Sequence, residues 1–271
     1  MPELPEVETT RRAIAQQIHQ RIITSAIIRN HQLRWPIDPQ LSQKMHNAQV
    51  VNVARRAKFL IIETSKGNLI LHLGMSGSLR YLPANVAAEK HDHLDIVFDN
   101  QHCLRLRDPR RFGACLWTTE PVEQHPLLCN LGPEPLSKEF TDTTLFDASR
   151  NRKIAVKNFI MNSHVVVGVG NIYASESLFM AGILPTKPAG KVSRGSYQKL
   201  TRCIQEVLEK SIAQGGTTLR DFTSSDGKPG YFQQTLMVYQ REGEACLQCG
   251  ASIKQIRIGQ RSSFYCPHCQ R

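Results

Sequence analysis

Long apolar runs are missing from this sequence of 271 residues. The richest apolar stretch, residues 165–174, is interrupted by Gly168, Gly170 and Asn171, whereas a membrane-spanning helix requires about 20 successive apolar residues. The N-terminal segment is acidic, where a secretory signal would be basic and then apolar. The sequence therefore excludes a transmembrane protein, and we expect a cytoplasmic one.

Acidic residues are also scarce. Asp and Glu number 23 against 34 Lys and Arg, which gives a formal net charge of +11 and favours a polyanionic partner. We find no internal repeat or low-complexity tract, and 41% hydrophobic with 21% charged residues is typical of a folded protein. At roughly 100–200 residues per domain, the length predicts two domains with room for a small added module.

The first half of the chain is predicted to be one helix followed by many strands. Pro5 suits a first helical position, and apolar residues on one face extend the helix over about residues 5–20. Short apolar runs at residues 59–62, 69–71 and 94–98 alternate with turn signals. This pattern indicates a β-sandwich or barrel.

A stretch rich in proline at residues 131–136 marks a domain boundary, because the apolar period after it becomes helical. Residues 137–222 read as several helices, including one over residues 196–214. A polar loop follows at residues 223–230. We expect domains at residues 1–133, 134–236 and 237–271.

Four of the eight cysteines form two pairs, Cys246-Leu-Gln-Cys249 and Cys266-Pro-His-Cys269, with sixteen residues between them. This spacing is typical of a four-thiolate zinc site, and four thiolates leave no coordination position for water, so the zinc is structural. The alternative, a pair of redox motifs, lacks the surrounding strand–helix–strand pattern. Between the pairs we expect a hairpin that bears Arg261. The other four, Cys103, Cys115, Cys129 and Cys203, are interpreted as small buried hydrophobes.

Two basic segments have open interpretations. Residues 105–112 carry four arginines beside Phe112 and resemble a strand that ends in a basic turn; they fit a nucleic-acid surface or a solvated strand face equally well. Residues 55–58, which end at Lys58, fit a nucleic-acid surface or a solubilising turn. Residues 168–171 place glycines and Asn171 at a helix start, where backbone amides can receive a phosphate, although the spacing excludes a dinucleotide site.

The N-terminus offers a reactive amine. A small second residue favours removal of Met1, which leaves Pro2 as a secondary amine. Terminal amines titrate near pH 8, and the positive end of the following helix lowers that pKa further. Glu3 is adjacent and can act as acid or base. From these residues alone, an ordinary processed N-terminus remains the alternative.

Six segments together resemble bacterial formamidopyrimidine-DNA glycosylase, in that family's order. They are residues 1–9 (MPELPEVET), 72–77 (HLGMSG), 108–113 (DPRRFG), 167–176 (VGVGNIYASE), 225–230 (SDGKPG) and the cysteine pairs at 246–269. The resemblance implies a multidomain α+β protein. Its parts are an N-terminal β-sandwich domain with an N-terminal helix, a helical helix-two-turn-helix domain and a C-terminal zinc-finger hairpin.

The resemblance also implies a bifunctional enzyme that excises 8-oxoguanine and formamidopyrimidines and then cuts the strand by β,δ-elimination. In that family's scheme Pro2 attacks C1′ to form a Schiff base, and Glu3 is the acid–base group. Lys58 matches the lysine assigned to β-elimination, and Arg261 matches the proton donor for δ-elimination. A lysine nucleophile is the rival to Pro2, but an unperturbed lysine is almost fully protonated at neutral pH.

The same resemblance assigns DNA contacts, one structural zinc and a monomer acting on double-stranded DNA. The family's residues that fill the vacancy of the extruded nucleotide match Met75, Arg110 and Phe112. The DNA-contacting positions are His72, His91, Arg110, Arg152 and Asn171, and residues 217–231 match the segment that closes over the flipped base.

Two residues differ from the family's usual pattern, and two alternative functions remain to be considered. Asn162 replaces an aspartate that many members have, and Gln255 stands where some have a lysine. The sister branch that removes oxidised pyrimidines shares the proline and glutamate, although Leu4 and the residues that fill the vacancy favour the purine branch. A non-catalytic zinc-ribbon DNA-binding protein is the rival from another class.

Overall fold

The computed structural model describes residues 2–216 and 236–271, so the closing segment expected at residues 217–231 lies outside the described residues. The chain divides into two compact units. Unit 1 comprises Met1–Cys129 with Gln214–Gln233, and unit 2 comprises Asn130–Ala213 with Gln234–Arg271. Within the part described, none of the helices has the length and apolarity that a membrane crossing demands.

Unit 1 begins with helix α1 (Leu4–Ile18), which starts one residue before the prediction. Glu3 is its N-cap: its side chain accepts the Glu6 N–H, and its own N–H donates to Glu6 Oε2 at 2.8 Å. This reciprocal capping satisfies two helix-end donors. The helix ends before Gln20 because that residue has a φ of 63° and donates its N–H to Val50 O at 2.9 Å.

Eight antiparallel strands follow in unit 1, confirming the predicted strand-rich domain. They are β1 (Ile22–Ile28), β2 (Ala48–Arg56), β3 (Phe59–Thr64), β4 (Gly67–His72), β5 (Ser78–Pro83), β6 (Asp92–Phe98), β7 (His102–Arg107) and β8 (Ala114–Thr118). Two short helices, α2 (Leu41–Met45) and η1 (Val122–Gln124), lie in the connections.

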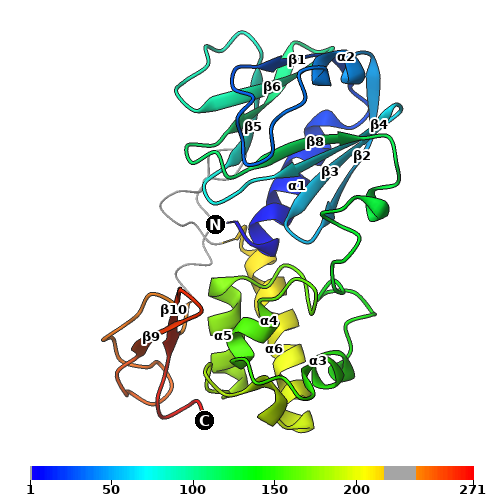
Figure 1. The fold of residues 1–271 in the computed structure, drawn as a ribbon. Coiled ribbons are helices and arrows are strands. Elements are labelled where there is room, and N and C mark those ends of the chain that lie inside the picture. The colour runs from blue at the N-terminus through cyan, green and yellow to red at the C-terminus, as the bar shows by residue number, and fades with distance from the viewer. Residues whose placement is uncertain (1, 217–235) are drawn as a thin grey trace. The chain divides into compact units, whose positions relative to one another are not determined.

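The strands are hydrogen-bonded in the order β5-β7-β6-β1-β2-β3-β4-β8. Two four-stranded halves meet where β1 and β2 share only the pairs Ile22↔Gln49 and Ile23↔Ala48. Apolar residues from both halves and from α1 form one core, and α1 packs against β2, β3 and β5 (Figure 1). A shared core between two strand layers is the arrangement of a β-sandwich.

Buried ion pairs cross-link one half of the sandwich. Arg105 is only 1% exposed; its guanidinium donates to Asp95 Oδ1 and Oδ2 at 2.8 and 2.7 Å, and to the carbonyls of Val86 and Ala87 at 2.9 and 3.1 Å. Both interpretations of the basic segment are therefore wrong for Arg105, which fixes the chain before β6. Only the end of that segment is exposed, at Arg110, Arg111 and Phe112.

Unit 2 holds the predicted helices and hairpin. The helices are α3 (Asp142–Ser149), α4 (Val156–Ile160), α5 (Asn171–Ala181), η2 (Ala189–Lys191) and α6 (Arg194–Ala213), and the strands are β9 (Lys254–Ile258) and β10 (Arg261–Tyr265). Helix α5 is buried on nearly every side and packs against α6 and β10. Figure 1 shows α4 and α5 in green beside the yellow α6.

Turns at residues 161–170 separate α4 from α5, as a helix-two-turn-helix requires. Asn162 organises the first turn: its Oδ1 accepts the His164 N–H at 3.0 Å, and its carbonyl accepts the N–H groups of Val165 and Val166. An amide oxygen and a carboxylate oxygen can both accept such a bond. The departure from aspartate at this position therefore leaves the turn intact.

Candidate nucleic-acid interface and metal centre

Two loops at one edge of the sandwich carry the residues expected to fill the vacancy left by an extruded nucleotide. Met75 lies between β4 and β5, whereas Arg110 and Phe112 lie between β7 and β8. A Cβ on Gly74, whose φ is +62°, would lie 2.5 Å from the carbonyl carbon of Phe112. The structure therefore packs the two loops backbone against backbone, and glycine permits that approach.

The ends of these loops present an aromatic ring and a cation. The Arg110 Cζ lies 5.0 Å from the centre of the Phe112 ring, and Phe112 is 43% exposed. Met75 is half-buried. An exposed ring under a guanidinium combines a surface that can stack on bases with a fork of hydrogen-bond donors.

His72 and Lys58 lie behind the Met75 loop. His72 pairs in register with Phe59, the residue after Lys58, and the two rings are 4.9 Å apart. The Gly74 N–H donates to His72 Nδ1 at 3.0 Å, so the ring proton must reside on Nε2. Burial, together with the nearby charges of Lys58 and Arg34, lowers the pKa of His72 to about 4. His72 is therefore a neutral N–H donor beside cations, which suits a phosphate oxygen.

Arg34 is a site residue that sequence reasoning missed. It is exposed, and its Cζ lies 4.8 Å from the centre of the Trp35 ring. Its charge acts on His72, which is 38 positions away in the sequence (72 − 34). The adjacent Arg-Trp pair was the available signal, since tryptophan is the best cation–π partner.

Pro2 and Glu3 precede α1 in a buried setting. Glu3 is 2% exposed and Glu6 is 3% exposed. A Cβ on Gly216 would lie 3.3 Å from Glu6 Oε1, so the last described residue before position 217 returns to the first turn of α1. Pro2, the carboxyl groups of Glu3 and Glu6, and Gly216 thus lie together in unit 1.

His91 lies directly before β6 with a φ of 77°. Its carbonyl accepts the N–H of Asp108 at 3.0 Å, and its ring lies edge-on to that of His93. The structure therefore brings His91 beside the loop that carries Arg110 and Phe112.

In unit 2, Asn171 is the first residue of α5, after the N-cap Gly170. Its Oδ1 accepts from Lys157 Nζ at 2.6 Å, and its Nδ2 donates to the Ser262 carbonyl at 3.0 Å. Arg152 is exposed in the segment between α3 and α4. Arg261 is exposed at the first position of β10, next to the residue that Asn171 contacts.

A buried lysine seats the tip of the β9–β10 hairpin on helix α4. Lys157 is 1% exposed, and its ammonium also donates to Ser263 Oγ at 2.7 Å and to the Ser262 carbonyl at 3.2 Å. A Cβ on Gly259 would lie 2.6 Å from Asn158 Nδ2, so the turn at the tip packs directly on the helix. Sequence reasoning missed Lys157; its place between apolar positions of a short helix was the only local signal.

Glu176 joins the start of the finger to α5. It is 2% exposed; its Oε2 accepts the Met237 N–H at 2.8 Å, and its Oε1 accepts those of Val238 and Tyr239 at 3.0 and 2.8 Å. Burial raises the pKa of Glu176, and the three N–H donors oppose that rise. This residue too was missed, because its partners are more than 60 positions away.

The four paired cysteines converge in unit 2. The sulfur atoms of Cys246, Cys249, Cys266 and Cys269 all lie within 4.8 Å of one another. At Zn–S bonds of about 2.3 Å, tetrahedral ligands are separated by roughly 4 Å, so this all-thiolate donor set fits one zinc ion with no open position. Among the scattered cysteines, Cys103, Cys115 and Cys203 are buried as predicted. The prediction is wrong for Cys129, which is exposed because it lies in the turn that follows η1.

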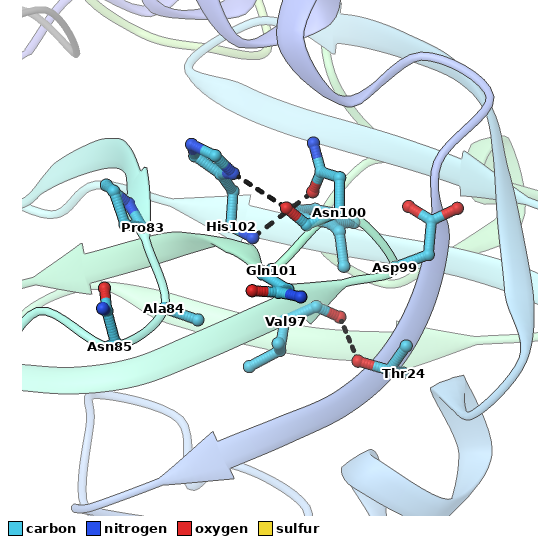
Figure 2. Close-up of a pocket in the computed structure, with 10 residues that line it drawn as sticks. Thr24, Pro83, Ala84, Asn85, Val97, Asp99, Asn100, Gln101 and His102 are labelled. Atoms are coloured by element: carbon cyan, nitrogen blue, oxygen red, sulfur yellow. Dashed lines mark hydrogen bonds between the residues drawn. The ribbon is translucent and has the colours of Figure 1, made fainter.

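A separate pocket of about 670 Å³ lies at the opposite end of the β6–β7 hairpin from His91 and Asp108. Figure 2 shows the residues that line it, among them Thr24, Asn100, Gln101 and His102. None of the predicted site residues lines this pocket. Its polar side chains are amides, a hydroxyl, the His102 imidazole and the Asp99 carboxylate, so it has no lysine or arginine to pair with a phosphate.

A sandwich with paired loops, a helix-two-turn-helix and a four-thiolate finger together define a multidomain DNA-binding protein with a structural zinc. The family models agree along the chain. Residues 1–115 match "Formamidopyrimidine-DNA glycosylase N-terminal domain", residues 131–223 match the "H2TH domain" of the same protein, and residues 243–271 match "Zinc finger found in FPG and IleRS".

Full-length relatives lead to the same assignment. The formamidopyrimidine-DNA glycosylases of Thioalkalivibrio sulfidiphilus and Pseudomonas aeruginosa are 55% and 54% identical over 271 residues, which is 100% of both chains in each case. The MutM (Fpg) structure from Thermus thermophilus matches with a TM-score of 0.89 and 33% identity, covering 99% of this chain and 98% of that one. The Lactococcus lactis Fpg complex with abasic-site DNA gives 0.91 and 34%, covering 99% of each. The chain belongs to the formamidopyrimidine-DNA glycosylase family.

Proposed function

We propose that this chain is a bifunctional DNA glycosylase and abasic-site lyase of base excision repair, which excises oxidised purines through a Schiff base on the amine of Pro2. The observation that carries the proposal is the grouping at the start of α1. Pro2 lies at the positive end of a helix, beside the buried carboxyl groups of Glu3 and Glu6. The helix end lowers the pKa of the amine, and a neighbouring carboxyl group can move its proton.

In this mechanism the unprotonated Pro2 nitrogen attacks C1′ of the damaged nucleotide, and the bond from C1′ to the base breaks. Glu3 serves as the acid–base group during ring opening of the sugar. The resulting iminium makes the adjacent carbon acidic, so the 3′ phosphate leaves in β-elimination, assisted by Lys58. The 5′ phosphate leaves in δ-elimination with a proton from Arg261. The zinc ion, held by its four thiolates, keeps the hairpin that bears Arg261 folded.

The remaining assignments concern DNA. Met75, Arg110 and Phe112 would fill the vacancy of the extruded nucleotide, and Arg110 would hydrogen-bond the orphaned base. His72, His91, Arg152 and Asn171 would contact DNA, chiefly at phosphates. The partner is double-stranded DNA with oxidised purines or abasic sites, and we propose a cytoplasmic monomer with domains at residues 1–133, 134–236 and 237–271.

Relatives bear on the choice of lesion. Structures of the Lactococcus lactis protein hold DNA with Fapy-dG or with an oxidised pyrimidine. We propose purine lesions as the main substrates, because Leu4 and the residues expected to fill the vacancy match the purine branch. Duplexes with 8-oxoguanine, thymine glycol or uracil test this choice, and faster release of thymine glycol than of 8-oxoguanine would move the chain to the pyrimidine branch.

Borohydride trapping tests the nucleophile. We expect intact mass to show that Met1 is absent, and reduction during reaction with abasic DNA to link the strand to residue 2, because only an iminium is reduced to a stable bond. Lys58→Gln is the matched control and should retain the cross-link. A link mapped by peptide sequencing to Lys58 would sink the Pro2 assignment, and no covalent link at all would favour a non-catalytic DNA-binding protein.

A further inference from the structure

One buried carboxyl group closes the loop at residues 108–113. Asp108 is fully buried at 0% exposure, and its Oδ2 accepts the Gly113 N–H at 2.8 Å. Its carbonyl accepts the Arg111 N–H at 3.2 Å. The loop therefore leaves Asp108 and returns to it within five residues, so that exposed residues, Arg110 and Phe112 among them, project from a closed turn.

The backbone of Asp108 is itself fixed on the sandwich. Its N–H donates to the His91 carbonyl at 3.0 Å, and its carbonyl also accepts from His93 Nε2 at 2.8 Å. His93 is 7% exposed and belongs to β6. Asp108 thus connects the start of β6, through His91 and His93, to the loop that ends in Phe112.

The far end of the loop has no room to adapt. A Cβ on Gly113 would lie 2.7 Å from the His72 carbonyl and 3.0 Å from Asp108 Oδ2. Gly74 packs equally tightly on the Phe112–Gly113 backbone from the Met75 loop. The bond between Asp108 and Gly113 therefore acts at the point where the two loops touch, so that a change in its length or direction is passed on to Phe112.

We propose that Asp108 is a positioning residue that holds Arg110 and Phe112 in the geometry needed for lesion excision and for discrimination of the base opposite the lesion. This inference rests on the proposed function of Arg110. The role requires an acceptor for the Gly113 N–H. It does not depend on a negative charge, because burial of the side chain raises the pKa of Asp108, although the N–H groups of Gly113, Arg110 and Arg111 and the charge of His93 oppose that rise. An asparagine, which keeps a carbonyl oxygen in the same position, should therefore replace it.

The experiment compares Asp108→Ala, Asp108→Asn and Arg110→Ala with the control Asp99→Ala. Asp99 is exposed in the turn at the other end of the same hairpin. Each variant is assayed for excision of 8-oxoguanine opposite all four bases, for cleavage of preformed abasic sites and for borohydride trapping. Because misplacing a contact group by about 1 Å can cost up to 10²-fold, Asp108→Ala should lower excision by about tenfold or more. It should also flatten discrimination between opposite bases while keeping trapping on abasic DNA.

The outcomes distinguish a failure of the positioning role of Asp108 from a failure of the role proposed for Arg110. Asp108→Asn should restore excision and discrimination, and Asp108→Ala in an Arg110→Ala background should add little, because residues acting through one element are not additive. If Arg110→Ala is silent, the proposed function of Arg110 fails. If Arg110→Ala is strong but Asp108→Ala is silent, or Asp108→Asn fails although it folds and traps normally, the positioning role is overturned. If the alanine variant does not fold, Asp108→Leu, which keeps the side-chain volume but has no acceptor, takes its place in every comparison.

Discussion

The sandwich and the zinc hairpin hold their exposed loops by different means. In the sandwich, eight strands and a helix share one large apolar core, and ion pairs such as Arg105 with Asp95 are added to it. The hairpin has two strands of five residues and a small apolar cluster that includes Cys246 and Cys266. Small folds without a sufficient core need a metal or a cross-link. The position of Arg261 therefore depends on few contacts, whereas that of Arg110 depends on many.

Removing zinc should have the largest effect, because it should unfold the hairpin and leave the sandwich folded. Metal binding supplies most of the folding free energy of such a finger, so a chelator should make the amides of β9 and β10 exchange rapidly and lower DNA affinity about a hundredfold or more. The sandwich should keep its melting temperature, and added zinc should restore binding. Complete loss of zinc with unchanged DNA affinity would show that the hairpin does not depend on its metal.

Lys157→Met should have a smaller effect, confined to unit 2. The substitution keeps the apolar stem but leaves Ser263 Oγ and Asn171 Oδ1 without the ammonium donor, and each buried acceptor left unpaired costs about 1–3 kcal/mol. Hydrogen exchange of the hairpin should accelerate while zinc content stays at one ion. Lys210→Met is the matched control, since that lysine is exposed on α6. Equal exchange in both variants would mean that the buried ammonium does not seat the tip.

The smallest effect concerns His72 in unit 1. Its folded pKa of about 4 lies below the ordinary 6.5, so the unfolded chain binds a proton that the folded chain does not. The contribution of His72 to the free energy of unfolding is therefore fully present above pH 6.5, and it is lost as the pH falls toward 4. Between pH 7.5 and 5.5 the unfolding free energy should fall by about 1 kcal/mol more in the wild type than in His72→Gln. Identical pH profiles in urea unfolding of the two proteins would contradict this.

The sequence was sufficient to predict those features that depend on residues close together in the chain. The helix at residues 4–18, the strands around Phe59, Leu69 and Leu94, and the cysteine spacing all follow from short-range periodicity or spacing. The resemblance supplied the candidate site residues, and the structure brings Met75, Arg110 and Phe112 onto adjoining loops. Their roles stay predictions until the variants are assayed.

Buried charges were beyond the reach of sequence reasoning. Arg105 belongs to a basic run that resembles a surface, and only the distant carbonyls of Val86 and Ala87 with Asp95 make it internal. Lys157 donates a hydrogen bond to Ser263, which is 106 residues away in the sequence, and Glu176 accepts one from Met237, which is 61 residues away. Such burial depends on partners that the fold brings together, and no local pattern encodes it.

The exposure of Cys129 has a practical consequence. It is the last residue of the first segment of unit 1, and of the four cysteines outside the metal cluster it alone presents its thiol to reagents. With zinc protecting the other exposed sulfur atoms, a maleimide dye would attach at a single place, next to the junction between the two units. The natural sequence thus already contains one attachment point for a spectroscopic label, with no cysteine to add or remove.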